Sequence, residues 1–236
     1  MTWNHKLGVW EGNRVPKGAF TLPKPLWVFG YASVCWKPTF PYVRTRKAYL
    51  SGYERRFWQL STDHRGTPSF PGLVCTLIPT ADIFTLEATD TKQNKIIKTG
   101  IYGLAYEIPE DQINEVLDHL DEREKGGYER TLVQITWADS KDKETVSALL
   151  YCGKIANPNF KCLPIDQCAK IINTAVGPSG KNSDYLFQLQ HYLNSNNMTD
   201  PYIEILSDAV QRLTNQQQNN SIANQEIIPL NILAKL

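Results

Sequence analysis

The chain has 236 residues, of which 42% are hydrophobic and 21% are charged. These proportions are typical of a soluble globular protein, and the length suffices for a large core without disulfide bonds. The 25 basic and 24 acidic residues leave a net charge of +1. That balance gives no electrostatic reason to expect a nucleic acid or an anionic membrane as a partner.

Cysteine usage and the N-terminal residues predict the compartment. The five cysteines are odd in number and form no CxxC pair, which favours reduced thiols over a disulfide framework or a metal site. The first residues lack the apolar run of a secretory signal, and no stretch approaches the length of a membrane span. We therefore expect a cytoplasmic location. The cysteines are Cys35, Cys75, Cys152, Cys162 and Cys168.

Strands dominate the first two thirds of the chain. Residues 1–24 mix glycine, proline and charge and predict an irregular extension. LWVFGYASVCW (26–36) begins as a buried strand and then turns. The polar, poorly patterned residues 80–100 predict an inserted loop, and TDHRGTPSFPG (62–72) predicts a turn-rich loop. Further strands are expected at 49–61, 73–79, 101–108, 131–137 and 145–154.

Helices dominate the last third. One helix is expected to start near Pro109, which the first helical turn tolerates. Others are expected at 165–176, 183–193 and 200–213, with an interruption at 177–182. NQQQNNS (215–221) is low in complexity and predicts a mobile segment. The pattern indicates an α+β fold, with an N-terminal extension (1–24), one domain (25–214) and a C-terminal tail (215–236).

The helix that starts near Pro109 ends in the charged stretch LDEREKGGYER (120–130). On a helical wheel its apolar side chains form one stripe, and Glu124 continues that stripe while its acidic neighbours face away or lie at its edge. A carboxylate on a buried face loses hydration, which raises its pKa and suits acid–base chemistry. The alternative is that the helix frays before Glu124, which then only pairs with an arginine. The stripe consists of Ile113, Val116, Leu117 and Leu120.

Three stretches occur in this order: VFGYASVCWKPTFPY (28–42), YERRFWQLSTDHRGTPSFPG (53–72) and REKGGY (123–128). Together they resemble the ChaC-type, glutathione-specific γ-glutamylcyclotransferases. LLYCGKIANPNFKCLP (149–164) and GPSGKNSDYLFQL (177–189) match the later portion of that family. The resemblance implies a small mixed β-barrel with flanking helices. It also implies cleavage of reduced glutathione to 5-oxoproline and Cys-Gly, without a metal or organic cofactor.

The resemblance assigns roles to individual residues. Glu124, the glutamate of REKGGY, is implied as the general acid and base. The family's YGSL-type loop cradles the γ-glutamyl group, and here it reads Tyr31, Ala32, Ser33 and Val34. Tyr128 and Tyr151 are implied to line the pocket, and Arg56 or Arg65 is a candidate to pair with the glycine carboxylate of glutathione, although either could instead fix a loop.

Alanine in place of the family's glycine at position 32 raises a question, because glycine serves where φ is positive or where backbones approach closely. Two alternatives therefore accompany glutathione cleavage. One is the same cyclisation of other γ-glutamyl peptides or amines, against which the RRFWQ and STDHRG stretches argue. The other is a γ-glutamyl-binding or protein-interaction module without turnover, against which Glu124 and the two tyrosines argue.

Overall fold

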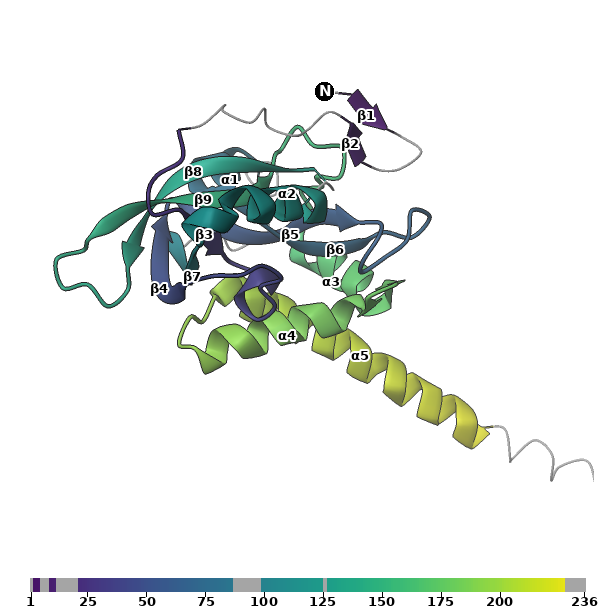
Figure 1. Cartoon of the computed structure of the whole chain (residues 1–236). Helices are drawn as coiled ribbons and strands as arrows, with labels where there is room; N and C mark the ends of the chain where they lie inside the picture. The colour runs from purple at the N-terminus through teal and green to yellow at the C-terminus, as the bar shows by residue number, and fades with distance from the viewer. Residues whose placement is uncertain (1, 5–8, 12–20, 87–98, 125–126, 228–236) are drawn as a thin grey trace, which may run out of the picture.

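A five-stranded closed barrel forms the centre of the fold, seen in a computed structural model that describes residues 2–4, 9–11, 21–86, 99–124 and 127–227. Its first strand runs parallel to the last and antiparallel to its other neighbour. The predicted small mixed barrel within an α+β fold is therefore confirmed (Figure 1). In barrel order the strands are β3 (Trp27–Gly30), β7 (Gly100–Glu107), β4 (Arg44–Ser51), β8 (Tyr128–Trp137) and β9 (Thr145–Gly153).

A separate hairpin and a group of helices lie against the barrel. The hairpin pairs β5 (Tyr53–Ser61) with β6 (Gly72–Pro79). Figure 1 shows α3, α4 and α5 on one side of this hairpin and α2 on the other. The helices are α1 (Thr80–Leu86), α2 (Ile113–Arg123), α3 (Ile165–Thr174), α4 (Asn182–Ser195) and α5 (Pro201–Ile227), and the short strands β10 (Val176–Gly177) and β11 (Gly180–Lys181) join α3 to α4.

The alternating side chains of β9 serve two hydrophobic cores. Ala148 and Leu150 belong to the main core, which also includes α3, α4 and α5. Leu149 and Tyr151 point the other way, into a second core beneath α2. Successive side chains of a strand alternate between its faces, so a strand that is covered on both faces is apolar throughout. The run ALLY in the sequence is explained by this double burial.

Helix α2 buries the predicted stripe in the second core. Val116, Leu117 and Leu120 are buried there, and Ile113 packs against them. A short 3-10 turn, Glu110–Gln112, precedes the helix. The helix ends at Arg123, and Glu124 is its C-cap residue, whose N–H still donates to the carbonyl of Leu120 at 2.9 Å.

Two predicted segments in the first half were wrong. The strand expected at 49–61 is two strands, because the chain turns at Gly52, whose φ of 78° is a conformation that glycine adopts easily. The loop expected at 80–100 begins with a helix, α1, whose Ile83 is fully buried. Residues 87–98 of that predicted loop lie outside the described residues.

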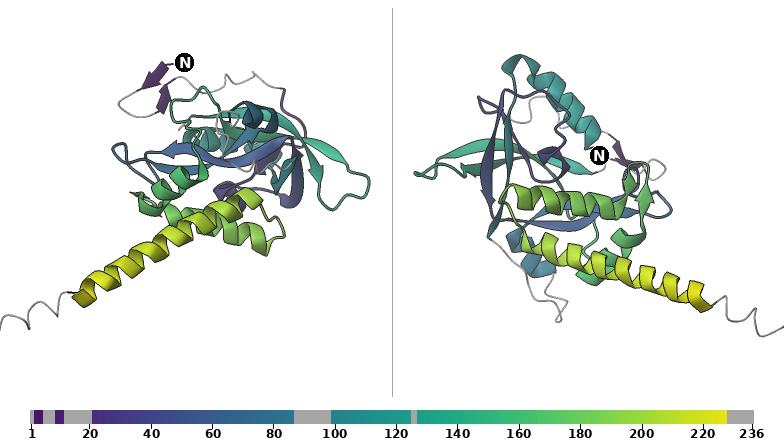
Figure 2. Two further views of the ribbon diagram at one scale, coloured as in Figure 1. Left: turned by 180° about the vertical axis from the view of Figure 1, so that it is seen from behind. Right: turned by 90° about the horizontal axis from the view of Figure 1, so that it is seen from below.

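The two ends of the chain also differ from expectation. The extension predicted to be irregular contains two short antiparallel strands, β1 (Thr2–Asn4) and β2 (Val9–Glu11); residues 5–8 and 12–20 lie outside the described part. The segment 215–221 continues α5, which extends away from the body of the protein (Figure 2). Residues 228–236 lie outside the described part, and the limits 25–214 stay a prediction. Among the described residues, no helix has the length and apolar character to cross a membrane.

Candidate active site

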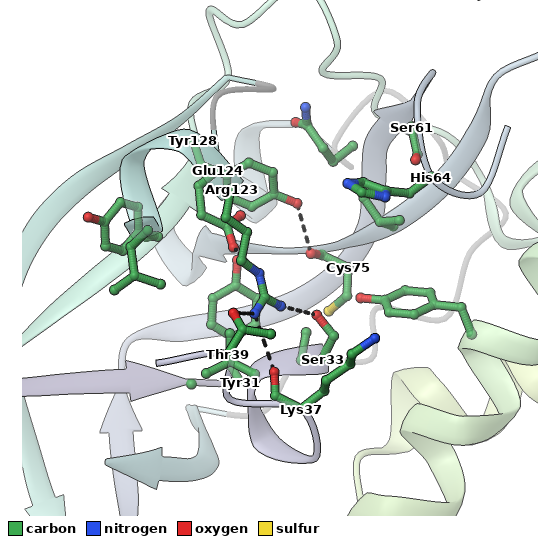
Figure 3. Close-up of a pocket in the computed structure, with 18 of the residues that line it drawn as sticks. Tyr31, Ser33, Lys37, Thr39, Ser61, His64, Cys75, Arg123, Glu124 and Tyr128 are labelled. Atoms are coloured by element: carbon green, nitrogen blue, oxygen red, sulfur yellow. Dashed lines mark hydrogen bonds and ion pairs between the residues drawn. The ribbon is translucent and has the colours of Figure 1, made fainter. Parts of the chain in front are cut away.

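A cavity of about 640 Å³ opens where β3, the end of α2, the β5–β6 hairpin and α4 meet (Figure 3). A volume of this order suits a small-molecule ligand. With the exception of Arg56, every residue that the sequence analysis assigned to the site lines this cavity. These residues are Tyr31, Ala32, Ser33, Val34, Arg65, Glu124, Tyr128 and Tyr151.

The loop after β3 (residues 31–39) forms one wall. It enters a 3-10 turn, Ser33–Cys35, in which the Cys35 N–H donates to the Ala32 carbonyl at 2.8 Å. The first N–H groups of such a turn have no partner within it and are available to a ligand. Ala32 has φ of −134°, outside the left-handed region that favours glycine. The backbone angle at position 32 therefore does not require glycine.

Glu124 lines the cavity from the end of α2, and only 19% of its side chain is exposed. Burial raises the pKa of this carboxyl, the Arg123 guanidinium opposes the rise, and the Asp63 carboxylate adds to it. The Arg123 Nε lies 3.2 Å from Glu124 Oε1. The two interpretations drawn from the sequence are thus both partly right. The helix ends before Glu124, which pairs with an arginine, and the carboxylate still points into the cavity.

Three tyrosines line the same space, of which Tyr31 and Tyr185 are buried and Tyr128 is partly buried. Burial raises the pKa of Tyr31, Tyr128 and Tyr185 above the ordinary value, so each keeps its hydroxyl proton at neutral pH. The Tyr128 hydroxyl donates a hydrogen bond to the Cys75 carbonyl at 3.1 Å. Tyr185 lies on α4 and was not singled out in the sequence. The only signal for it was its place in the GPSGKNSDYLFQL stretch.

Tyr151 contributes to the cavity wall, but its hydroxyl is engaged elsewhere. It donates to Asp121 Oδ1 at 2.9 Å. The same carboxylate accepts hydrogen bonds from Arg130, which ties the last turn of α2 to β8. The structure therefore places Tyr151 in a network that supports the end of α2, and its hydroxyl is not directed at Glu124.

The two candidate arginines, Arg65 and Arg56, lie in different environments. Arg65 lines the cavity, where its guanidinium lies 5.5 Å from the centre of the Tyr185 ring and donates to the Lys181 carbonyl at 3.1 Å. Arg56 does not line it. Its side chain is 1% exposed and lies over the ring of Tyr202 on α5, at 4.7 Å. Arg56 is a core residue that joins β5 to α5, and the expectation that it contacts substrate is not supported.

The structure adds charged and polar residues that the sequence analysis did not assign to the site. They lie on α2 or in the loops after β3 and β5. Within the described part of the chain, no cluster of three or more histidine, cysteine or acidic side chains is arranged to hold a metal ion, and all five cysteines are free thiols. The added residues are Lys37, Thr39, Asp63, His64, His119 and Arg123.

The five-stranded mixed barrel is the fold of the γ-glutamylcyclotransferases, and the cavity with Glu124 lies beside the loop that follows its first strand. The crystal structure of a γ-glutamyl cyclotransferase specific to glutathione from yeast matches with a TM-score of 0.71 and 32% identity, over 79% of this chain and 96% of that one. The chain belongs to the ChaC-like protein family, whose family model matches residues 26–213.

Curated relatives carry names consistent with that family. The "Glutathione-specific gamma-glutamylcyclotransferase" of Schizosaccharomyces pombe is 40% identical over 169 residues, which cover 70% of this chain and 80% of the relative. The "Glutathione-specific gamma-glutamylcyclotransferase 1" of Mus musculus is 34% identical over 193 residues, which cover 80% of this chain and 79% of the relative.

Proposed function

We propose that this chain is a lyase that cleaves reduced glutathione to 5-oxoproline and Cys-Gly, with Glu124 transferring the proton. Membership of the ChaC-like family, with relatives named for this activity, supports the reaction and the substrate. The position of Glu124 carries the proposed mechanism. Its carboxylate is largely buried in a cavity that also contains the loop after β3.

The reaction needs no enzyme nucleophile. The α-amine of the γ-glutamyl group attacks its own γ-carbonyl carbon, which closes a five-membered lactam and breaks the bond to the cysteine nitrogen. The α-nitrogen arrives as an ammonium group and ends as the lactam N–H, so it loses two protons, one before the attack and one after it. The leaving nitrogen gains one proton as its bond breaks and a second when the free amine becomes an ammonium group. Glu124 accepts a proton from the attacking nitrogen and passes it to the leaving nitrogen, and the second proton passes in the same direction through Glu124 or solvent. A carboxyl whose pKa burial has raised is well matched to both steps.

The cavity also has groups that suit the ends of glutathione. Glutathione carries two carboxylates, and Lys37 and Arg65 are cations that line the cavity. We assign Arg65 to the glycine carboxylate, because it lines the cavity from the loop after β5, beside Tyr185, and not from the loop after β3 that would hold the γ-glutamyl group. The N–H groups at the start of the 3-10 turn, together with the neutral hydroxyls of Tyr31 and Tyr185, would hold the γ-glutamyl group and the oxyanion that forms during attack.

The test is product formation. Purified protein is incubated with reduced glutathione, oxidised glutathione or γ-glutamyl-alanine, and 5-oxoproline is measured by mass spectrometry. We expect release from reduced glutathione alone, and loss of at least ~100-fold in kcat for Glu124→Gln, which keeps the shape but cannot accept the proton. Normal turnover by that variant would refute the assigned mechanism, and equal release from γ-glutamyl-alanine would refute specificity for glutathione.

The non-catalytic alternative rested on alanine at position 32. Because the backbone there has a negative φ, we expect Ala32→Gly to change kcat/KM by less than about threefold. Steady-state kinetics with glutathione check this. A rise of tenfold or more would show that the alanine methyl obstructs the cavity, which would favour a chain with impaired turnover.

We also propose a reducing compartment such as the cytoplasm. The proposed substrate is the reduced form of glutathione, and the five cysteines of the chain are free thiols. Fluorescence microscopy of the tagged full-length chain checks this location, and accumulation in a secretory compartment would contradict it.

A further inference from the structure

We propose that Arg123 is a positioning residue that locks the end of α2 to the loop after β3, so that Glu124 and the γ-glutamyl-binding groups keep one arrangement. This inference rests on the proposed function. The sequence analysis assigned no role to Arg123, but only 20% of its side chain is exposed. Figure 3 shows its guanidinium directed into the cavity, between Glu124 and the loop.

The contacts of Arg123 bridge two parts of the chain that are about ninety residues apart. One terminal nitrogen donates to Ser33 Oγ at 2.9 Å. The other donates to Thr39 Oγ1 at 3.0 Å and to the Lys37 carbonyl at 3.3 Å. The Nε faces Glu124 Oε1 at 3.2 Å. One planar group therefore fixes both ends of the loop and the carboxylate at once.

The number of donors indicates that Arg123 positions the site and is not itself a carboxylate clamp for substrate. A guanidinium has five N–H donors in a fixed fork. Three of these donors are directed at the loop after β3 and the Nε–H is directed at Glu124, which leaves one N–H donor for another partner. A bidentate clamp on a substrate carboxylate needs two free donors on one side of the fork. Lysine would retain the charge but lose the fork.

Other groups that change charge also face Glu124 or its loop. Asp63 and His64 line the cavity from the loop after β5, and the three cavity tyrosines stay neutral near neutral pH because desolvation raises the pKa of each hydroxyl. His119, one helical turn before Arg123, has its Nε2 2.8 Å from the same Thr39 hydroxyl. Because histidine changes charge near neutral pH, each pH profile is recorded in the native chain and in a His64→Gln background.

The experiment compares Arg123→Gln with Arg123→Lys, using glutathione as substrate. For Arg123→Gln we expect kcat/KM to fall at least ~10-fold and the acidic limb of its pH profile to move to higher pH, because the cation that favours ionised Glu124 is gone. For Arg123→Lys we expect the limb to stay in place while KM rises, because the charge remains but the loop is released.

Controls separate this role from a loss of folding. Arg44→Gln makes the same charge change at an exposed arginine outside the cavity, where we expect no effect on the profile. If Arg123→Gln does not fold, Thr39→Val removes one acceptor of the fork, keeps the charge, and is expected to raise KM without moving the limb. An unmoved limb in folded Arg123→Gln, or an unchanged KM in Arg123→Lys or in Thr39→Val, overturns the inference.

The Glu124→Gln variant distinguishes this inference from the proposed function. If Glu124→Gln retains normal turnover, the Glu124 mechanism is wrong and the positioning role of Arg123 is wrong with it. If Glu124→Gln is inactive but the Arg123 variants behave like the native chain, the proposed function stands and the positioning role alone is refuted.

Discussion

Gly127 lies in the turn between Glu124, at the end of α2, and Tyr128, whose N–H donates to the Glu124 carbonyl at 3.2 Å. Its φ is 106°, and a Cβ placed there would come within 2.0 Å of Asn157 Nδ2. That amide is buried and donates to the Gly127 carbonyl at 2.9 Å. We expect Gly127→Ala to cost about 3 kcal/mol of stability, from backbone strain and overpacking together. Displacement of Glu124 and Tyr128 should also lower kcat/KM at least ~10-fold.

Gly52 provides the matched control. It also has a positive φ, 78°, but a Cβ there would meet nothing within 4 Å. Gly52→Ala should cost about 1 kcal/mol from the backbone alone, with unchanged kcat/KM. Chemical denaturation and steady-state kinetics on both variants check the pair. Equal effects on kcat/KM would show that the contact with Asn157 has no part in the site.

Because the pKa of Glu124 is raised in the folded chain, we expect its ionised carboxylate to lower the folding stability at neutral pH. The folded chain binds this proton more tightly than the unfolded chain, so stability falls as pH rises from the unfolded pKa, about 4.3, through the folded one. Glu124→Gln removes that cost. We expect a higher Tm than the native chain at pH 7 and no difference near pH 4. A Glu124→Gln variant that is less stable at pH 7 would show that the Arg123 pair outweighs the burial.

The position of Glu124 in the cavity could be predicted because a pattern and a motif agreed: it continues an apolar stripe and stands in REKGGY. Its catalytic role stays a prediction. Arg123 was missed because the last contacts of a helix depend on a loop about ninety residues away. Arg56 was expected to contact substrate, but β5 is buried on both faces there and a β-bulge follows, so alternation along the strand does not show which side an arginine faces.

At the scale of elements, one buried ion pair connects α5 to the site. Arg55 on β5 donates to the Tyr31 carbonyl at 2.8 Å and to Asp200 Oδ2 at 3.0 Å. The other oxygen of Asp200 accepts from the Tyr202 N–H at 3.1 Å, in the first turn of α5. The start of α5, the hairpin strand β5 and the loop after β3 are therefore held by one guanidinium.

Asp200→Asn tests this connection. Asparagine can still cap the helix, but it leaves the Arg55 charge buried without a carboxylate. We expect a loss of about 3–5 kcal/mol, measured by chemical denaturation. Asp139→Asn, which removes an acid from the more exposed pair with Arg46, should have a much smaller effect on stability. A similar small loss at both positions would contradict a structural role for the buried pair.

Helices and strands were predicted wrongly where the residue composition of a segment favours a different structure from the one it adopts. The run YLSGYERRFWQLS looks like one strand because its flanks are rich in strand-forming residues, and only the positive φ at Gly52 divides it. The segment after Leu213 looks mobile because it is polar and repetitive, yet glutamine is a good helix former and the helix propagates from the packed turns before it. Element type at strongly periodic segments, such as α2 and α4, was predicted correctly.

Over the whole molecule, the cavity is assembled from segments that the sequence keeps far apart. The loop after β3, the β5–β6 hairpin, the end of α2 and the start of α4 each contribute part of the wall. Hydrogen bonds of individual side chains link these segments. Arg123 joins the loop after β3 to the end of α2, and Arg55 joins the same loop to β5 of the hairpin. Asn182 holds α4 to the hairpin through two hydrogen bonds with the Leu73 backbone. Motifs in the sequence predicted some of the residues that line this cavity, whereas the remaining lining residues and the contacts that link the segments could be found only from the fold.

The far end of α5 belongs to none of these connections, so the predicted domain limit at residue 214 can be tested by truncation. Val210 is fully buried, Leu213 is partly buried, and Thr214 Oγ1 donates to Asn173 Oδ1 at 2.8 Å. The side chains of residues 215–220 are exposed. We expect a chain that ends at Thr214 to keep its stability within about 1 kcal/mol and its kcat/KM unchanged, because surface changes have small effects. A chain that ends at residue 206 also loses Val210 and Leu213 and should be destabilised by at least ~2 kcal/mol. Equal losses for both truncations, measured by urea denaturation, would mean that the domain extends beyond residue 214.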